Sequence, residues 1–227
     1  MSDAFSAIGA LADPVRRRLY EYVVASDAGV GREEAAREVG VAPHTARFHL
    51  DRLVEEGLLA VEQRRLTGRT GPGAGRPAKV YRRAEGEVAV SLPDREYDLV
   101  GQVLAAAVER SLGGAGLEDS LVEEARAAGR RDGTSYDGRG GELARSAGAL
   151  AARGFEPHRV DDGLVLRNCP FDSLAREHTA LVCGVNHDYV AGVLEGLGCT
   201  QTCARLDPGR DRCCVRVEAT DASTSSE

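Results

Sequence analysis

The stretch that decides the fold of the first part of the chain is GREEAAREVGVAPHTARFHLDRLVEEGLL, residues 31–59. Its small and aliphatic residues recur at helical spacing in two short segments, and Gly40 provides a tight turn between them. The inner faces of the two segments comprise Ala35, Ala36 and Val39, and then Ala46, Leu50, Leu53 and Leu58. Two short helices that meet at a glycine turn predict a helix-turn-helix, although any three-helix bundle could carry the same pattern.

The flanking sequence extends this motif into a winged domain. Upstream, Asp13-Pro14 is expected to open a helix, because proline is tolerated in a first helical turn. Downstream, residues 59–65 and 80–83 have strand character, and the Gly/Pro-rich loop 66–79 separates them. A long hairpin loop with basic residues is typical of a wing that contacts phosphates, and the alternative is a surface loop with incidental cations. The basic residues of the loop are Arg69, Arg76 and Lys79.

Charge is distributed unevenly along the 227 residues, whose net charge is −7. The net value by itself disfavours a nucleic-acid partner. However, residues 43–83 carry nine Arg or Lys against four Asp or Glu, whereas residues 91–227 carry fifteen against twenty-three. A basic segment followed by an acidic body is consistent with a protein that contacts DNA through one surface only.

Beyond residue 90 the sequence predicts helices and then a small mixed unit. A helix is expected from Pro93-Asp94 to about residue 112, with an apolar and small-residue face. Later elements are expected as helices near 117–129, 141–153, 171–183 and 186–197, a hairpin that turns on Asp162-Gly163, and strands at 200–206 and 213–218. We therefore expect an α+β protein. Its segments are a winged helix-turn-helix domain (1–90), a helical linker and dimerisation region (91–154), a cysteine-bearing sensor domain (155–220) and a disordered tail (221–227).

Cysteine usage and hydropathy bear on the compartment. No apolar run approaches the roughly 20 residues that a membrane span needs, and the N-terminus has no secretion signal. We therefore expect a cytosolic (cytoplasmic) protein with no membrane partner, where structural disulfides are uncommon. No CxxC pair occurs, which disfavours a zinc ribbon. The cysteines all follow residue 168: Cys169, Cys183, Cys199, Cys203, Cys213 and Cys214.

Residues 31–83 resemble the winged helix-turn-helix of ArsR-like bacterial regulators, through HTARFHLDRLVEEGLL and the GRPAKVY that follows it. The resemblance implies binding to double-stranded DNA. It also implies a homodimer formed through the helix at 94–112. The alternative is that this helix belongs to the core of the second domain. The groove-facing residues that it implies on the recognition helix are Pro43, His44, Thr45, Arg47 and Phe48.

Within that set, Arg47 is the main candidate for a base contact, because arginine recognises guanine O6 and N7 in the major groove. Phe48 either touches a thymine methyl or packs on a neighbouring side chain. The adjacent His49 is interpreted as a histidine packed between helices.

The run NCPFDSLAREHTALVCGVNHDYVAGVLEGLG, followed by ARLDPGRDRCCV, resembles the C-terminal domain of SufR-type regulators. The resemblance implies an iron–sulfur cluster, for which thiolates are suitable soft donors. The ligands that it implies are Cys169, Cys183 and Cys213, with Cys214, Cys199 and Cys203 as alternatives. Neighbours in a strand point to opposite faces, so only one of Cys213 and Cys214 is expected to face a shared site. Cys183 could instead be ordinary buried core.

These observations favour a DNA-binding transcriptional repressor whose operator affinity depends on the iron–sulfur cluster. One alternative is a regulator with the same DNA-binding domain in which the cysteines form a metal-free thiol switch. In a variant of this alternative, the last domain senses another small ligand. Another is an enzyme with Cys169 or Cys183 as nucleophile and His178 or His187 as base. The chain has no glycine-rich phosphate loop, paired catalytic carboxylates or nucleophile elbow, so we expect no enzymatic activity.

Overall fold

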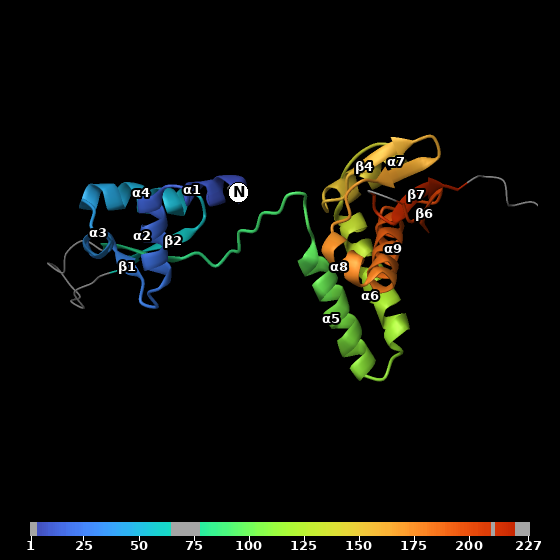
Figure 1. The fold of residues 1–227 in the computed structure, drawn as a ribbon, viewed down its shortest axis with the longest axis horizontal. Helices are drawn as coiled ribbons and strands as arrows, with labels where there is room; N and C mark the ends of the chain where they lie inside the picture. Colours follow the sequence, from blue (N-terminus) through green and yellow to red (C-terminus); the bar gives the residue numbers. More distant parts are fainter. Residues whose placement is uncertain (1–3, 65–77, 210–211, 221–227) are drawn as a thin grey trace, which may run out of the picture. The chain divides into compact units, whose positions relative to one another are not determined.

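The computed structural model describes residues 4–64, 78–209 and 212–220, which divide into two compact units, Met1–Val90 and Ser91–Glu227 (Figure 1). Helices and antiparallel sheets occur in both units, which confirms the predicted α+β class. Arg69, Arg76 and the predicted tail at 221–227 lie outside the described residues.

The first unit is a small helical domain with a three-stranded sheet. Its helices and strands are α1 (Ala4–Ala10), α2 (Pro14–Val24), β1 (Val30–Gly31), α3 (Arg32–Val39), α4 (Pro43–Glu55), β2 (Leu59–Arg64) and β3 (Ala78–Arg83). Helix α2 begins where Asp13 caps it, with the carboxylate accepting hydrogen bonds from the backbone N–H groups of Val15 and Arg16. Gly40 ends α3 in a left-handed conformation and so turns the chain into α4.

The predicted inner faces of α3 and α4 form the centre of the first core. Ala35, Ala46, Leu50 and Leu53 are fully buried there, whereas Val39 is only partly buried at its edge. The sheet has the antiparallel order β1-β3-β2. Strand β1 was not predicted, because two residues carry no periodicity. The β2–β3 hairpin follows directly after α4, as a wing requires.

The described part of the second unit contains four longer helices, one short helix and a four-stranded antiparallel sheet of order β4-β5-β7-β6. Its elements are α5 (Tyr97–Leu112), α6 (Leu117–Ser135), α7 (Glu142–Ala151), β4 (Pro157–Val160), β5 (Gly163–Leu166), α8 (Asp172–Glu177), α9 (Thr179–Gly196), β6 (Thr202–Leu206) and β7 (Val215–Ala219).

Helices α6 and α9 lie in close contact through small residues. A side chain added at Gly129 would meet the Tyr189 carbonyl oxygen, and one added at Gly192 would meet that of Arg126. The two backbones can approach so closely only because these positions lack a Cβ atom. This contact joins the region 91–154 to the region 155–220 around one core, so the structure does not separate them into two domains as expected.

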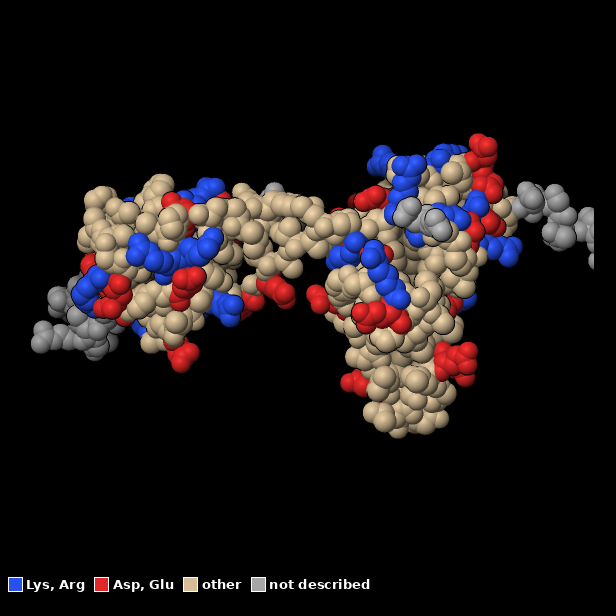
Figure 2. Space-filling model, in the orientation of Figure 1, with Lys and Arg blue, Asp and Glu red and all other residues tan. Residues whose placement is uncertain are grey.

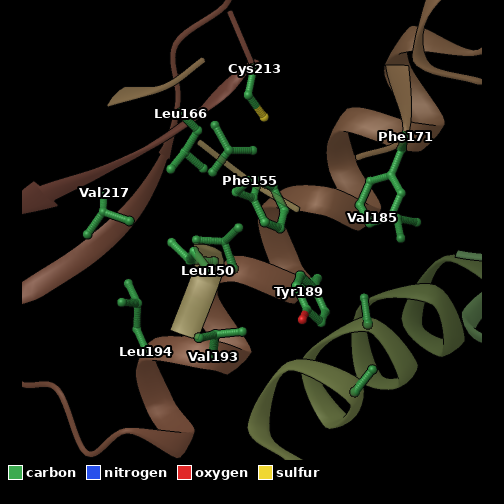
Figure 3. Close-up of a cluster of buried hydrophobic side chains, with 14 of the residues drawn as sticks. Leu150, Phe155, Leu166, Phe171, Val185, Tyr189, Val193, Leu194, Cys213 and Val217 are labelled. Atoms are coloured by element: carbon green, nitrogen blue, oxygen red, sulfur yellow. The ribbon is translucent and has the colours of Figure 1, made fainter. Parts of the chain in front are cut away.

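That core gathers side chains from α5, α6, α7, α9 and the sheet. Phe155, Phe171 and Tyr189 form its aromatic centre, and Figure 3 shows Cys213 beside Leu166 near the sheet. Helix α9 runs unbroken through Gly184, and the chain breaks instead at His178. The break predicted near 184 was therefore wrong, because packing of α9 on α6 overrides the low helix propensity of glycine.

Candidate nucleic-acid interface and thiol site

The recognition helix α4 presents most of its predicted groove-facing residues to solvent. Pro43, His44, Arg47 and Phe48 are exposed and Thr45 is half-buried, with 65% of Phe48 accessible. His49 is buried, as predicted, and its Nδ1 accepts a hydrogen bond from Arg16 Nε at 3.3 Å. The edge of the Phe48 ring contacts the His49 ring, with 5.2 Å between centroids.

An acidic residue that no sequence motif singles out connects the recognition helix to the wing. Asp51 of α4 lies 3.5 Å from Arg47 Nε, and its Oδ1 accepts hydrogen bonds from Lys79 Nζ and the Tyr81 hydroxyl, each at 2.8 Å. Burial opposes ionisation of Asp51, but the bonds from Lys79 and Tyr81 outweigh it and lower its pKa. Burial and the Asp51 charge raise the pKa of Tyr81. Two predicted DNA contacts, Arg47 and Lys79, are thus held by one carboxylate.

A cavity of about 450 Å³ lies beside these residues. Its lining comes from α3, α4, β2 and β3: Arg32, Glu33, Arg47, Gln63, Ala78, Lys79 and Tyr81. On the face of the first unit seen in Figure 2, basic and acidic side chains lie next to one another. The basic surface is therefore partly neutralised by the protein's own carboxylates.

In the second unit, four cysteines from three distant segments lie near one another. The pKa of Cys169 responds to Cys213, that of Cys213 to Cys169 and Cys214, and that of Cys183 to Cys214. Cys169 lies in the turn between β5 and α8, Cys183 in α9, and the adjacent pair just before β7. We call these four residues the four-thiol site.

The expectation that only one of Cys213 and Cys214 faces a shared site was based on a strand at this position. Strand β7 begins at Val215, so the pair lies in the preceding irregular segment, where side chains need not alternate. The other two cysteines lie elsewhere. Cys199 follows α9, with its sulfur 3.7 Å from Ser146 Oγ, and Cys203 pairs with Glu218 in the β6–β7 ladder.

The protonation of the four-thiol site is set by the mutual contacts and by burial. A hydrogen bond with Cys213 and burial raise the pKa of Cys169, and burial raises that of Cys183. The bond with Cys169 lowers the pKa of Cys213, but the bond with Cys214 and burial outweigh it and raise the pKa to about 11. These three thiols are therefore protonated at neutral pH, a state in which a thiol is a poor nucleophile.

Asn186 of α9 completes the surroundings of the site. Its side chain is fully buried, and Nδ2 donates a hydrogen bond to Cys213 Sγ at 3.0 Å. Its Oδ1 has no hydrogen-bond partner within the described parts of the chain. A buried carbonyl oxygen without a partner is costly, and such atoms in native proteins often mark the place of a missing ligand or water.

The SufR-type resemblance implies an iron–sulfur cluster, whose usual ligands are cysteine thiolates. In the parts of the chain that the structure describes, no three His, Cys, Asp or Glu side chains converge as a site for a single metal ion. An iron–sulfur cluster has several irons and is held by four thiolates, so it does not require convergence on one ion. Four neighbouring thiols, with a buried amide donor beside one sulfur, fit a cluster in number and chemistry.

The histidines considered as catalytic bases are placed differently. His178 is exposed at the junction of α8 and α9, and His187 Nδ1 lies 3.4 Å from the Asp188 carboxylate. Neither of these positions brings the histidine into a hydrogen bond with a cysteine in the described part of the chain.

Comparison with known proteins identifies the first unit. A family described as a helix-turn-helix domain matches residues 11–62, from the end of α1 into β2. The first unit contains a helix-turn-helix domain. Its match includes the whole recognition helix and supports a DNA-binding transcriptional regulator. No curated protein and no solved structure matches the chain. Among the described residues, no helix is long and apolar enough to cross a membrane.

Proposed function

We propose that this regulator is a homodimeric transcriptional repressor whose operator affinity is set by an iron–sulfur cluster on Cys169, Cys183, Cys213 and Cys214. The observation that supports the proposal is the gathering of four cysteines from three distant segments in one region of the fold, in a chain whose other unit contains a helix-turn-helix. In this account the chain has no enzymatic activity and acts in the cytoplasm.

On the DNA side, α4 enters the major groove and the β2–β3 wing lies on the backbone. Arg47 is exposed on the outer face of α4 and can reach a base edge. Lys79 stands at the start of the wing strand β3 and is suited to a phosphate. Arg47 and Lys79 can contact DNA only if they release Asp51 or contact Asp51 and the DNA at the same time.

On the sensor side, the four thiols lose their protons when they bind iron, and the cluster supplies a redox-active group that ties the three segments together. The raised pKa values of Cys169, Cys183 and Cys213 oppose formation of the thiolate that a metal-free thiol switch or a cysteine nucleophile would use, and binding of iron would have to lower them. Asn186 donates to the Cys213 sulfur and would keep doing so with the cluster bound.

The dimer is proposed to form through the α5–α6 arm. Exposed apolar side chains lie near its tip, and the face seen in Figure 2 shows few charged atoms at this end, although Glu109, Arg110, Glu118 and Asp119 are also exposed there. Leu112 is 84% exposed, and Val108, Leu117 and Val122 are exposed on the same two helices. A second copy of the chain would cover these side chains and place two recognition helices on a palindromic site.

The experiment is an anaerobic absorption spectrum with iron and sulfide assays on the full chain and its cysteine variants. We expect a coloured protein with bound iron and sulfide. Single changes of Cys169, Cys183, Cys213 or Cys214 to Ser should remove most of the colour. Cys199→Ser is the matched control and should keep it. Protein reconstituted anaerobically that binds no iron or sulfide would refute the cluster and leave the small-ligand sensor.

A further inference from the structure

The turn that carries Cys169 is tied to the first residues of the second unit by a compact set of hydrogen bonds. Asn168 precedes Cys169 directly, and Arg95 lies at the other end of the contact, just before α5. We call this set the Arg95–Asn168 contact. It occurs entirely within the second unit.

Each side chain makes more than one bond. Arg95 Nη1 donates to Asn168 Oδ1 at 2.6 Å and to the Cys169 carbonyl oxygen at 3.3 Å. Asn168 Nδ2 donates to the Asp94 carbonyl oxygen at 3.0 Å and to that of Gly154 at 2.6 Å. The Glu96 N–H adds a bond to the Pro170 carbonyl oxygen at 3.1 Å. The Asn168 side chain and the carbonyl oxygens of Cys169 and Pro170 are thus bonded to residues 94–96.

The contact is buried and sterically tight. Asn168 is almost fully buried, and 18% of the Arg95 side chain is accessible. Gly154 has a φ of +73°, and a Cβ atom there would come within 2.8 Å of the Asp94 Cβ. Buried bonds of this kind are costly to break singly, so the two segments move together or separate together.

The contact also explains why α5 begins three residues later than the sequence predicts. A helix was expected from Asp94, yet α5 starts at Tyr97. Asp94, Arg95 and Glu96 use their backbone or side-chain groups to bond the Cys169 turn, so they are not free to form a first helical turn.

The position of residues 91–96 in the chain gives the contact its consequence. Val88 is the last apolar residue packed on the first core, and Ser91 Oγ already accepts a bond from the Arg95 N–H at 2.8 Å. Ala89 and Val90 alone separate these two residues in the sequence. Residues 91–96 are therefore separated by only a very short stretch of chain from the last packed residue of the helix-turn-helix unit.

We propose that Asn168 is a positioning residue that transmits the state of Cys169 to residues 91–96, and through them to DNA binding. The inference rests on the proposed function, since it takes Cys169 to be a cluster ligand. With iron bound, Cys169 and its turn are fixed, and the Arg95–Asn168 contact holds the start of the second unit. When the ligand is released, the turn gains freedom and residues 91–96 are held less firmly. Such coupling requires one element whose arrangement differs between the two states.

The test compares wild type, Asn168→Ala and Arg95→Ala as full-length protein, each with and without cluster. The control Arg145→Ala removes a bond to the Leu197 carbonyl oxygen in the same unit, outside the contact. Hydrogen exchange of peptides covering 91–96 gives the local readout. Affinity for the tightest duplex that wild type selects from a random-sequence library gives the functional one. Iron and sulfide content shows whether the cluster is present.

In wild type and Arg145→Ala, we expect exchange at 91–96 to be at least several-fold faster without cluster, and DNA affinity to differ about 5- to 150-fold between states. In Asn168→Ala and Arg95→Ala that still bind iron, both differences should fall to within about twofold. If Asn168→Ala fails to fold, Arg95→Ala, which leaves the buried amide in place, decides alone.

Two results overturn the inference. One is a variant with a full cluster that keeps the wild-type ratio of affinities. The other is wild-type exchange at 91–96 that does not respond to the cluster. Failure of the proposed function is distinguishable, because it would appear in wild type itself as a lack of iron and sulfide or as equal DNA affinities in the two states.

Discussion

Asp51 shows how a single residue can set the balance between specific and general DNA binding. It holds Arg47 and Lys79, and it adds a negative charge to a surface that meets phosphates. A phosphate must compete with this carboxylate for both cations, whereas a correct base pair offers Arg47 a bidentate contact that compensates. Specificity is a difference of affinities, and a residue that penalises the wrong partner increases it.

Asp51→Asn is therefore expected to bind mixed-sequence duplex DNA more tightly and with a stronger salt dependence, by roughly one additional released counterion. The measurement is fluorescence anisotropy across a range of salt concentrations. Glu55→Gln, on the same helix and paired with Arg52, is the control for a change of one charge. Equal effects of the two substitutions would contradict a special role for Asp51.

At the scale of single residues, the sequence predicted the cations of the interface but not the carboxylate that organises them. Arg47 and Lys79 stand out by residue type and by their place in the motif. Asp51 looks like one of many helix acids, and only the fold brings β3 beside it. The same holds for Asn186, whose contact with Cys213 joins residues 27 positions apart.

The elements of the second unit depend on contacts that periodicity does not reveal. Gly129 was expected to end a helix and Gly192 to lie within one, and both lie inside long helices where two backbones meet. The pair Cys213 and Cys214 reads as the start of a strand, yet it lies before β7, so both thiols join the same site. The N-terminal motif was predictable because its apolar spacing, Gly40 and Asp13 all act locally.

The α6–α9 contact gives a direct stability prediction. Gly192→Ala places a methyl group 2.3 Å from the Arg126 carbonyl oxygen, so the helices must shift and the free energy of unfolding should fall by about 1–3 kcal/mol or more. Gly101→Ala in α5 meets nothing within 4 Å and should stabilise by up to about 1 kcal/mol. Urea unfolding measures both changes. A Gly192→Ala protein as stable as wild type would contradict the close contact.

The α5–α6 arm is the element on which the proposed dimer depends. Leu112→Asp should shift the protein from dimer towards monomer at micromolar concentration, because a charge at a buried apolar interface is costly. Val160→Asp in β4 also changes an exposed apolar residue and should leave the dimer intact. Sedimentation velocity distinguishes the species. A wild type that is monomeric at micromolar concentration and still binds a half-site tightly would contradict the dimer.

At the scale of the whole molecule, two units with separate cores are joined by a short stretch of chain, and each has its own chemistry. The charge asymmetry of the sequence predicted this division, because the basic segment lies in the first unit and the acidic excess in the second. The merging of 91–154 with 155–220 was not predictable, since it depends on helix contacts between residues about 60 positions apart.

The central claim is that the cluster state of the second unit controls DNA binding by the first. The most direct measurement is the equilibrium affinity of cluster-loaded and cluster-free protein for the same selected duplex at the same salt concentration. A coupling free energy of about 1–3 kcal/mol predicts a difference of roughly 5- to 150-fold. Equal affinities, in protein shown by iron and sulfide assay to carry a full cluster, would contradict the account.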